Sequence, residues 1–104
     1  FEGIRNVHIA TERRDGASDV VHLYVVRTPY RAQLARHLLD AGVQTDIHYP
    51  LPDHRQTIFA NRFADTRLPV TEKLADEILT LPCHPTLREE EIVHVIDACN
   101  RFLP

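Results

Sequence analysis

Residues 20–29 have the sequence VVHLYVVRTP, which contains the clearest strand signal in the chain. β-Branched and aromatic side chains dominate residues 20–27, which predicts a strand there. Thr28 and Pro29 follow at once, and a threonine cap before a proline in the first helical position is typical of a helix start. Leu34 and Leu38 then recur at helical spacing up to Gly42, where glycine commonly ends a helix. The stretch therefore predicts a strand that leads directly into a helix.

Strand signals flank this unit on both sides. Residues 7–11 alternate weakly between apolar and polar side chains and predict a short strand. The polar residues 12–19 contain Asp15-Gly16, a turn signal that favours a hairpin. Residues 43–49 alternate more clearly and predict another strand, which the prolines that follow would end.

The second half of the chain alternates in the same way. A short helix is expected at residues 56–63, a helix capped by Thr71 at residues 72–78, and an extended strip at residues 79–82. Thr86 and Glu89 have the spacing of a capping box, so the last helix is expected to open at Pro85-Thr86. Its apolar positions follow the helical repeat and predict the buried face: Ile92, Val95, Ile96, Cys99 and Phe102.

The composition excludes several classes of protein. The chain has 104 residues, 43% of them hydrophobic and 26% charged, which is ordinary for a folded domain. Two cysteines are too few for a disulfide scaffold. A net charge of −3 disfavours a basic nucleic-acid-binding domain, and the chain has no apolar run long enough for a membrane span. The chain begins at Phe1 and contains no methionine, so we expect it to be a piece of a longer protein.

These elements predict an α+β fold in a single domain over residues 1–104. We expect a small mixed or mainly antiparallel sheet with helices on one face. So few strands cannot be covered on both faces by three main helices. The other face of the sheet is therefore left for solvent or for a partner.

The most unusual stretch is HYPLPDHRQ at residues 48–56. Two prolines stiffen a loop that carries hydrogen-bonding side chains at the end of an expected strand. The imidazole of His48 and the hydroxyl of Tyr49 suit a polyhydroxylated or phosphorylated ligand. The alternative is a stiff surface turn with Tyr49 packed in the core.

Other chemistry has weaker support. A metal site built from His48, His54, Cys83 and His84 would lack the paired ligands of closed zinc sites, so no metal site is expected. Arg27 and Arg31 could hold a carboxylate or a phosphate, or could simply be solvated. The only lysine, Lys73, can pair with Glu77 four residues on, which is typical of a surface lysine and not of a Schiff-base lysine.

The order of these motifs resembles the C-terminal domain of the DegT–StrS family, the pyridoxal-phosphate-dependent sugar aminotransferases. The resemblance covers about residues 20–102. It rests on HYP-x-P-x-H-x-Q at residues 48–56 followed by L-x-LP-x-HP at residues 79–85. It implies the small C-terminal domain of an aspartate-aminotransferase-type (fold type I) protein. The large domain, which carries the cofactor and its lysine, would lie outside this chain.

The resemblance also implies a function. The parent would be a transaminase that moves an amino group, typically from glutamate, to a nucleotide-linked keto sugar for lipopolysaccharide, other surface polysaccharides or antibiotic sugars. By the motif match, His48 and Tyr49 would bind this substrate, with His54 and Gln56 in supporting roles. The chain itself would hold no catalytic residue and no cofactor, and it would be inactive alone. Its partners would be its own large domain and the second subunit of a cytoplasmic homodimer, with no nucleic acid or membrane. The alternative is a stand-alone α+β module that binds a small ligand or regulates.

Overall fold

The computed structural model describes residues 1–6, 8–9, 16 and 20–104. The strand expected at residues 7–11 and the hairpin loop expected at residues 12–19 fall largely outside the described residues. Among those described, no helix has the length and the apolar character needed to cross a membrane. In chain order the elements are β1 (Tyr24–Arg27), α1 (Arg31–Asp40), η1 (Asp53–Arg55), η2 (Thr57–Phe59), α2 (Pro69–Glu77), β2 (Ile78–Leu81) and α3 (Glu89–Arg101).

The two strands form one antiparallel pair, which confirms the α+β class. Tyr24 lies opposite Leu81, and Arg27 lies opposite Ile78. The strand expected from residue 20 is therefore too long, because regular pairing begins at Tyr24. The register explains this limit: the next residue along β2 is Pro82, which has no N–H to donate to a ladder.

Helix α1 begins later than expected. Thr28 is buried, and its N–H donates to the carbonyl of Glu77 over 3.0 Å. Its hydroxyl accepts a hydrogen bond from the N–H of Tyr30 at 3.2 Å, so Thr28 stabilises a turn and does not cap the helix. At the other end Gly42 has a φ of +78°, a left-handed conformation that favours glycine. The N–H of Val43 donates to the carbonyl of Leu38 at 2.8 Å, so the predicted glycine stop is confirmed as a Schellman motif.

The strand expected at residues 43–49 is wrong. Only Asp46 pairs with β2, through two hydrogen bonds to Thr80 of 3.1 and 2.7 Å. The expected alternation is partly present, because Val43 is buried and Gln44 is exposed. Tyr49, expected on the same side as Val43, is exposed instead. The segment therefore meets β2 at one residue and then leaves the sheet.

The boundaries of the remaining helices also shift. The helix expected at residues 56–63 is reduced to the 3₁₀ turn η2, and a second 3₁₀ turn, η1, comes just before this range. Helix α2 begins at Pro69 and not at residue 72, since Pro69 fits the first helical turn and Leu68 occupies the cap position. Helix α3 begins at Glu89, because the Thr86 hydroxyl pairs with His84 and the Glu91 carboxylate accepts the N–H of Arg88 at 2.8 Å. The capping box expected at Thr86 is therefore wrong.

The core lies between the strand pair, α1 and α3. Val26, Leu79 and Leu81 project from the strands onto the same side as the buried leucines of α1. The two helices are tied together as well, because His37 Nε2 donates to the carbonyl of Ala98 at 3.0 Å. The buried leucines predicted for α1, Leu34 and Leu38, are confirmed. Of the face predicted for α3, Val95, Cys99 and Phe102 are buried, whereas Ile92 and Ile96 are only partly buried. The core cluster consists of Ile9, Val26, Leu34, Leu38, Val43, Leu79, Leu81, Val95, Ala98, Cys99 and Phe102.

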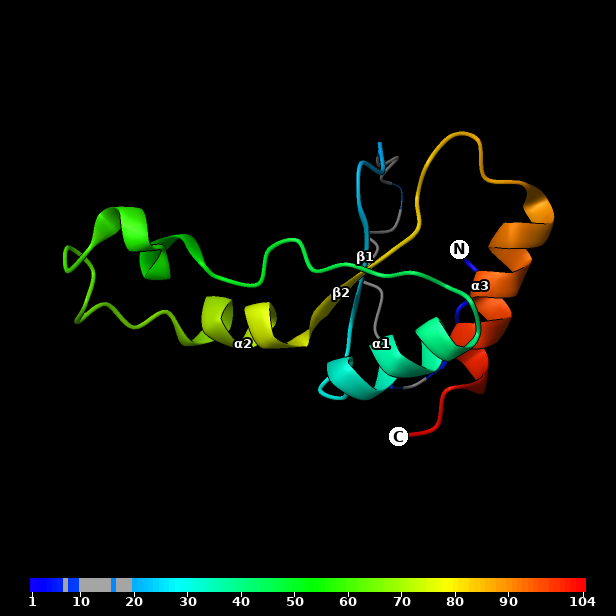
Figure 1. The fold of residues 1–104 in the computed structure, drawn as a ribbon, viewed down its shortest axis with the longest axis horizontal. Helices are drawn as coiled ribbons and strands as arrows, with labels where there is room; N and C mark the ends of the chain where they lie inside the picture. Colours follow the sequence, from blue (N-terminus) through cyan, green and yellow to red (C-terminus); the bar gives the residue numbers. More distant parts are fainter. Residues whose placement is uncertain (7, 10–15, 17–19) are drawn as a thin grey trace.

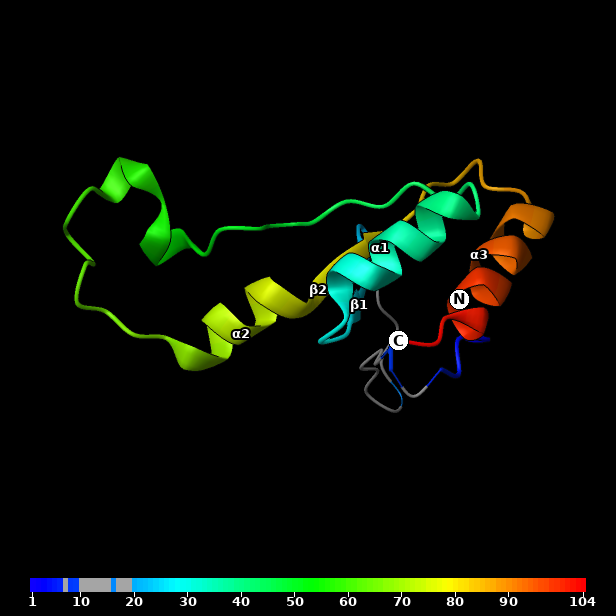
Figure 2. The same cartoon turned by 60° about the horizontal axis from the view of Figure 1, so that its bottom comes forward.

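Residues 50–68, which we call the arm, project from this core together with α2. Figure 1 shows them on the left, while α1, α3 and both chain ends lie on the right. Figure 2 shows the same separation from another side. The molecule measures 47 × 32 × 25 Å, with a radius of gyration of 15.4 Å. A compact chain of this length would have a radius of about 13 Å, so the arm makes the domain elongated.

Candidate functional site

His48 and Tyr49 lie just after Asp46, where the chain turns away from the edge of β2 and enters the arm. The side chain of His48 is partly buried, and its Nδ1 lies 3.0 Å from the hydroxyl of Thr80. The rings of His48 and Tyr49 meet edge to face, with 5.5 Å between their centroids. Tyr49 is 70% exposed, so the alternative that packs Tyr49 in the core is wrong. The pair therefore presents one imidazole and one phenol at the surface, and the imidazole is held by its contacts with Thr80 and Tyr49.

A polar cavity lies on the His48 side. It has a volume of about 470 Å³ and is bounded by the residues around the Asp46–Thr80 bridge and by the chain on either side of Pro82. His22, Cys83 and His84 reach it as well. Most of the residues that line this cavity with His48 carry hydrogen-bonding side chains, and Leu23, Leu81 and Pro82 complete the lining.

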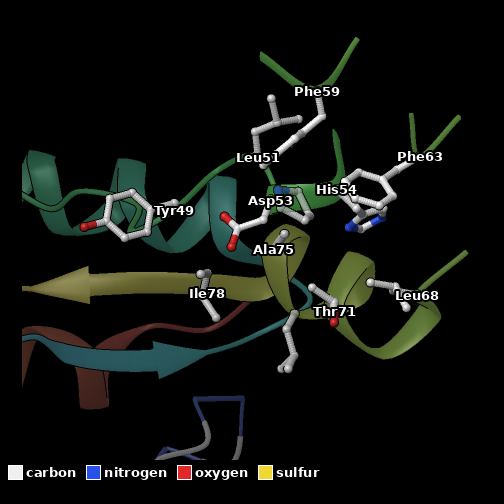
Figure 3. Close-up of a pocket in the computed structure, with 12 residues that line it drawn as sticks. Tyr49, Leu51, Asp53, His54, Phe59, Phe63, Leu68, Thr71, Ala75 and Ile78 are labelled. Atoms are coloured by element: carbon white, nitrogen blue, oxygen red, sulfur yellow. The ribbon is translucent and has the colours of Figure 1, made fainter. Parts of the chain in front are cut away.

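An apolar cavity lies on the Tyr49 side, between the arm and α2. Its volume is about 630 Å³. In Figure 3, Tyr49 stands at one end of this cavity, Leu51 and Phe59 lie on the arm side, and Ala75 and Ile78 lie on the opposite side. His48 and Tyr49 thus stand at the boundary between a polar and an apolar hollow.

His54 and Gln56 do not converge on His48. The side chain of His54 is only 6% exposed, and its Nε2 lies 2.9 Å from Glu72 Oε1. Gln56 donates to Asp53 Oδ1 at 3.1 Å and lines neither of the two cavities. The structure therefore separates the four motif residues: His48 borders the polar cavity, Tyr49 and His54 border the apolar one, and Gln56 stands apart.

Glu72 organises the arm, and sequence reasoning missed it. Its Oε1 also lies 2.9 Å from the guanidinium of Arg55 and 3.4 Å from the N–H of Leu68. The hydrogen bond with His54, followed by those with Arg55 and Leu68, lowers the pKa of Glu72 from 4.5 to about 2. A carboxylate in the first turn of a helix was the available signal. Its partners, 17 and 18 residues away, follow no sequence pattern.

The other cationic candidates have structural partners. Arg27 Nε lies 2.6 Å from Glu77 Oε2, and Arg31 donates to the carbonyl of Ala75. Both arginines therefore tie the end of α2 to the β1–α1 unit and are not arranged around a bound anion. Lys73 is 66% exposed, with its Nζ 3.8 Å from a Glu77 oxygen. A Schiff-base lysine needs a desolvated amine, so Lys73 does not fit the site of pyridoxal phosphate.

The metal alternative requires His48, His54, Cys83 and His84 to meet. His54 lies in the arm on Glu72, whereas the other three border the polar cavity. Within the described part of the chain, no group of three or more histidine, cysteine, aspartate or glutamate side chains is arranged to hold a metal ion.

The chain is a small α+β domain built on an antiparallel strand pair. A long arm projects from it, and the His48–Tyr49 pair lies at the base of this arm. Residues 1–100 match the DegT/DnrJ/EryC1/StrS aminotransferase family. The chain belongs to this family.

Three relatives illustrate the match. The chain is 35% identical to dTDP-3-amino-3,6-dideoxy-α-D-galactopyranose transaminase of Aneurinibacillus thermoaerophilus, over 98% of this chain and 28% of that protein. It is 45% identical to the erythromycin biosynthesis sensory transduction protein EryC1 of Saccharopolyspora erythraea, over 82% of this chain and 24% of that protein. The crystal structure of NtdA from Bacillus subtilis, with bound cofactor PMP, superposes with a TM-score of 0.68 at 31% identity. The match covers 75% of this chain and 19% of NtdA. The chain spans about a quarter of the length of the curated relatives it matches.

Proposed function

We propose that this chain is the C-terminal small domain of an aminotransferase that moves an amino group from glutamate to a nucleotide-linked keto sugar. Family membership and the transaminase among the relatives support the reaction class. The observation that carries the proposal is the His48–Tyr49 pair, braced on Thr80 and open to solvent between the two cavities. Such a pair suits a sugar, because an imidazole and a phenol can each donate or accept a hydrogen bond.

Within this proposal the four motif residues have two roles. His48 and Tyr49 hydrogen-bond the hydroxyls of the sugar, since both have polar atoms accessible from solvent. His54 supports the site through Glu72, because its ring is buried on that carboxylate. Gln56 supports the site by fixing Asp53 at the start of η1. Sugar specificity would then depend on the stiffness of the arm as well as on direct contacts.

The cofactor in this proposal is pyridoxal phosphate held by a large domain outside the chain. The cofactor supplies the electron sink that amino transfer needs. Lys73 is unsuited to bind it, so the 104-residue chain would be inactive alone. The arm and α2 offer exposed apolar side chains for contact with that large domain and with the second subunit of a homodimer, among them Leu51 and Ile58 of the arm and Val70 of α2.

The test uses the full-length protein with pyridoxal phosphate, L-glutamate and a panel of UDP- and dTDP-linked keto sugars. Formation of 2-oxoglutarate reports amino transfer. His48→Ala and Tyr49→Phe should each raise KM for the sugar and leave KM for glutamate unchanged. The matched control is His94→Ala, which removes an exposed imidazole of α3 that lines neither cavity and contacts the carbonyl of Ala41. A protein that forms no 2-oxoglutarate with any sugar of the panel would contradict the proposal.

A regulatory role is the second candidate, because the relative EryC1 is named a sensory transduction protein. A regulatory protein with the same site would bind a nucleotide sugar without converting it. Tight binding in calorimetry combined with no formation of 2-oxoglutarate would favour this candidate over the transaminase.

A further inference from the structure

We propose that Thr80 is the positioning residue for His48: its hydroxyl orients the imidazole so that Nε2 faces the substrate. This inference rests on the proposed role of His48 in sugar binding. Thr80 lies in the middle of β2, and its Oγ1 is 3.0 Å from Nδ1 of His48. It is separated from His48 by 32 residues, so the two meet only because the fold brings the base of the arm onto β2.

The hydroxyl of Thr80 is held on a rigid support. Thr80 is 6% exposed and lies opposite Val25 in the strand pair. On its other side, its N–H and carbonyl both bond to Asp46, over 2.7 and 3.1 Å. Strand β2 therefore has a neighbour on both edges at Thr80, which bonds to Asp46 on one edge and lies opposite Val25 on the other. The β-branched side chain of Thr80 also has few rotamers. A polar atom on such a support can fix a neighbouring ring more accurately than one on a loop.

The ring of His48 is constrained from three directions. Thr80 holds Nδ1, and the ring of Tyr49 packs edge to face beside it. The carboxylate of Asp46 lies 3.9 Å from Nε2. That carboxylate is largely exposed, and its other oxygen accepts the N–H of Ile47 at 2.7 Å. Nε2 is consequently the ring nitrogen that remains for a ligand.

These contacts also select the proton position on a neutral ring. A carboxylate near Nε2 favours a hydrogen on that nitrogen, and Nδ1 then accepts the hydrogen bond from the Thr80 hydroxyl. In this tautomer His48 offers Nε2–H as a donor, which suits a hydroxyl, keto or phosphate oxygen of a nucleotide sugar. Without the Thr80 hydroxyl, Nδ1 would lose its partner and the ring could rotate.

The experiment measures binding of UDP-N-acetylglucosamine and dTDP-glucose to the full-length, cofactor-loaded protein by calorimetry. Thr80→Val keeps the branched shape and removes the hydroxyl, and Thr80→Ser keeps the hydroxyl. Loss of one hydrogen bond corresponds to weakening of about 3- to 10-fold, so we expect that loss in Kd for Thr80→Val and a Kd within about twofold of the parent for Thr80→Ser. The matched control is Thr57→Val, which removes an exposed threonine hydroxyl of η2 that lines neither cavity and should leave Kd unchanged.

A double-mutant cycle separates positioning from a merely structural role. If Thr80 acts through His48, the effect of Thr80→Val disappears in a His48→Ala background. An equal loss in both backgrounds, or an equal loss for Thr80→Ser, would overturn the inference. If His48→Ala weakens binding and Thr80→Val does not, the inference fails and the proposed function stands. If the parent protein binds neither sugar nucleotide and forms no 2-oxoglutarate from any keto sugar, both fail together.

Discussion

The imidazole Nε2 of His54 lies 2.9 Å from Oε1 of Glu72, which joins the beginning of the arm to the first turn of α2. The same oxygen accepts a hydrogen bond from Arg55. Arg55 in turn donates to the carbonyl of Thr66 at 3.1 Å, near the far end of the arm. A single carboxylate therefore closes the arm into a loop, and the motif residue His54 belongs to this closure.

Removing that carboxylate should loosen the arm without unfolding the domain. Glu72→Gln weakens the charge-assisted hydrogen bonds to His54 and Arg55. The core cluster contains no residue of the arm, so it should remain intact. We expect faster amide hydrogen exchange in peptides from residues 50–68 of the full-length protein, with unchanged exchange in α3.

The matched control for this variant is Asp65→Asn, which makes the same carboxylate-to-amide change at an exposed arm residue. It should leave exchange as in the parent. Equal acceleration by both substitutions would show that arm order depends on charge in general and not on Glu72.

The contribution of Glu72 should also depend on pH. Its pKa is lowered from 4.5 to about 2 in the folded chain, chiefly by the hydrogen bond with His54. A depressed carboxyl pKa stabilises the fold above pH 4.5, and this stabilisation is lost as the pH falls from 4.5 towards 2. The difference in arm protection between the parent and Glu72→Gln should therefore be full at pH 6, mostly lost near pH 2 and absent below it. Exchange rates corrected for their intrinsic pH dependence test this, and a difference as large at pH 2 as at pH 6 contradicts it.

Local sequence patterns correctly predicted the structural features that depend on residues close together in the chain. The apolar repeat of α3 and the glycine stop of α1 are both present. The same reasoning failed at residues 43–49, because alternation shows which side chains face inwards and not how many residues find a strand partner. It also placed the beginning of the first strand too early, because the first paired residue of that strand is set by Pro82, which lies far along the chain.

In the candidate site, too, the sequence indicated residues within a local motif but missed residues that only the fold brings near. The motif at residues 48–56 directed attention to His48 and Tyr49, which the structure places side by side at the surface. Their supports come from other elements, namely Thr80 in β2 and Glu72 in α2. No spacing rule connects residues 18 or 32 positions apart when a tertiary contact brings them together. The sequence could therefore indicate which side chains might bind a ligand, but not which residues hold them in place.

The two cysteines should differ in reactivity. Burial raises the pKa of the Cys99 thiol to about 11, whereas Cys83 is partly exposed at the polar cavity. Only the thiolate is nucleophilic, so at pH 8 iodoacetamide should leave Cys99 unmodified in the native protein. Peptide mass mapping should detect modified Cys99 only after unfolding in urea. Rapid native labelling of Cys99 would contradict its placement in the core.

Two leucines of α1 provide the sharpest test of the packing. Leu34 is fully buried in the core, whereas Leu39 on the same helix is 58% exposed. Leu34→Ala removes the same atoms as Leu39→Ala but leaves a cavity between α1, α3 and the strands. A core truncation of this kind costs about 2–5 kcal/mol, whereas an exposed one changes stability by about 0.5 kcal/mol or less. Native-state hydrogen exchange at the α3 amides of the full-length protein measures both changes, because α3 packs on the same cluster. Equal losses for the two variants would mean that α1 presents a different face to the core.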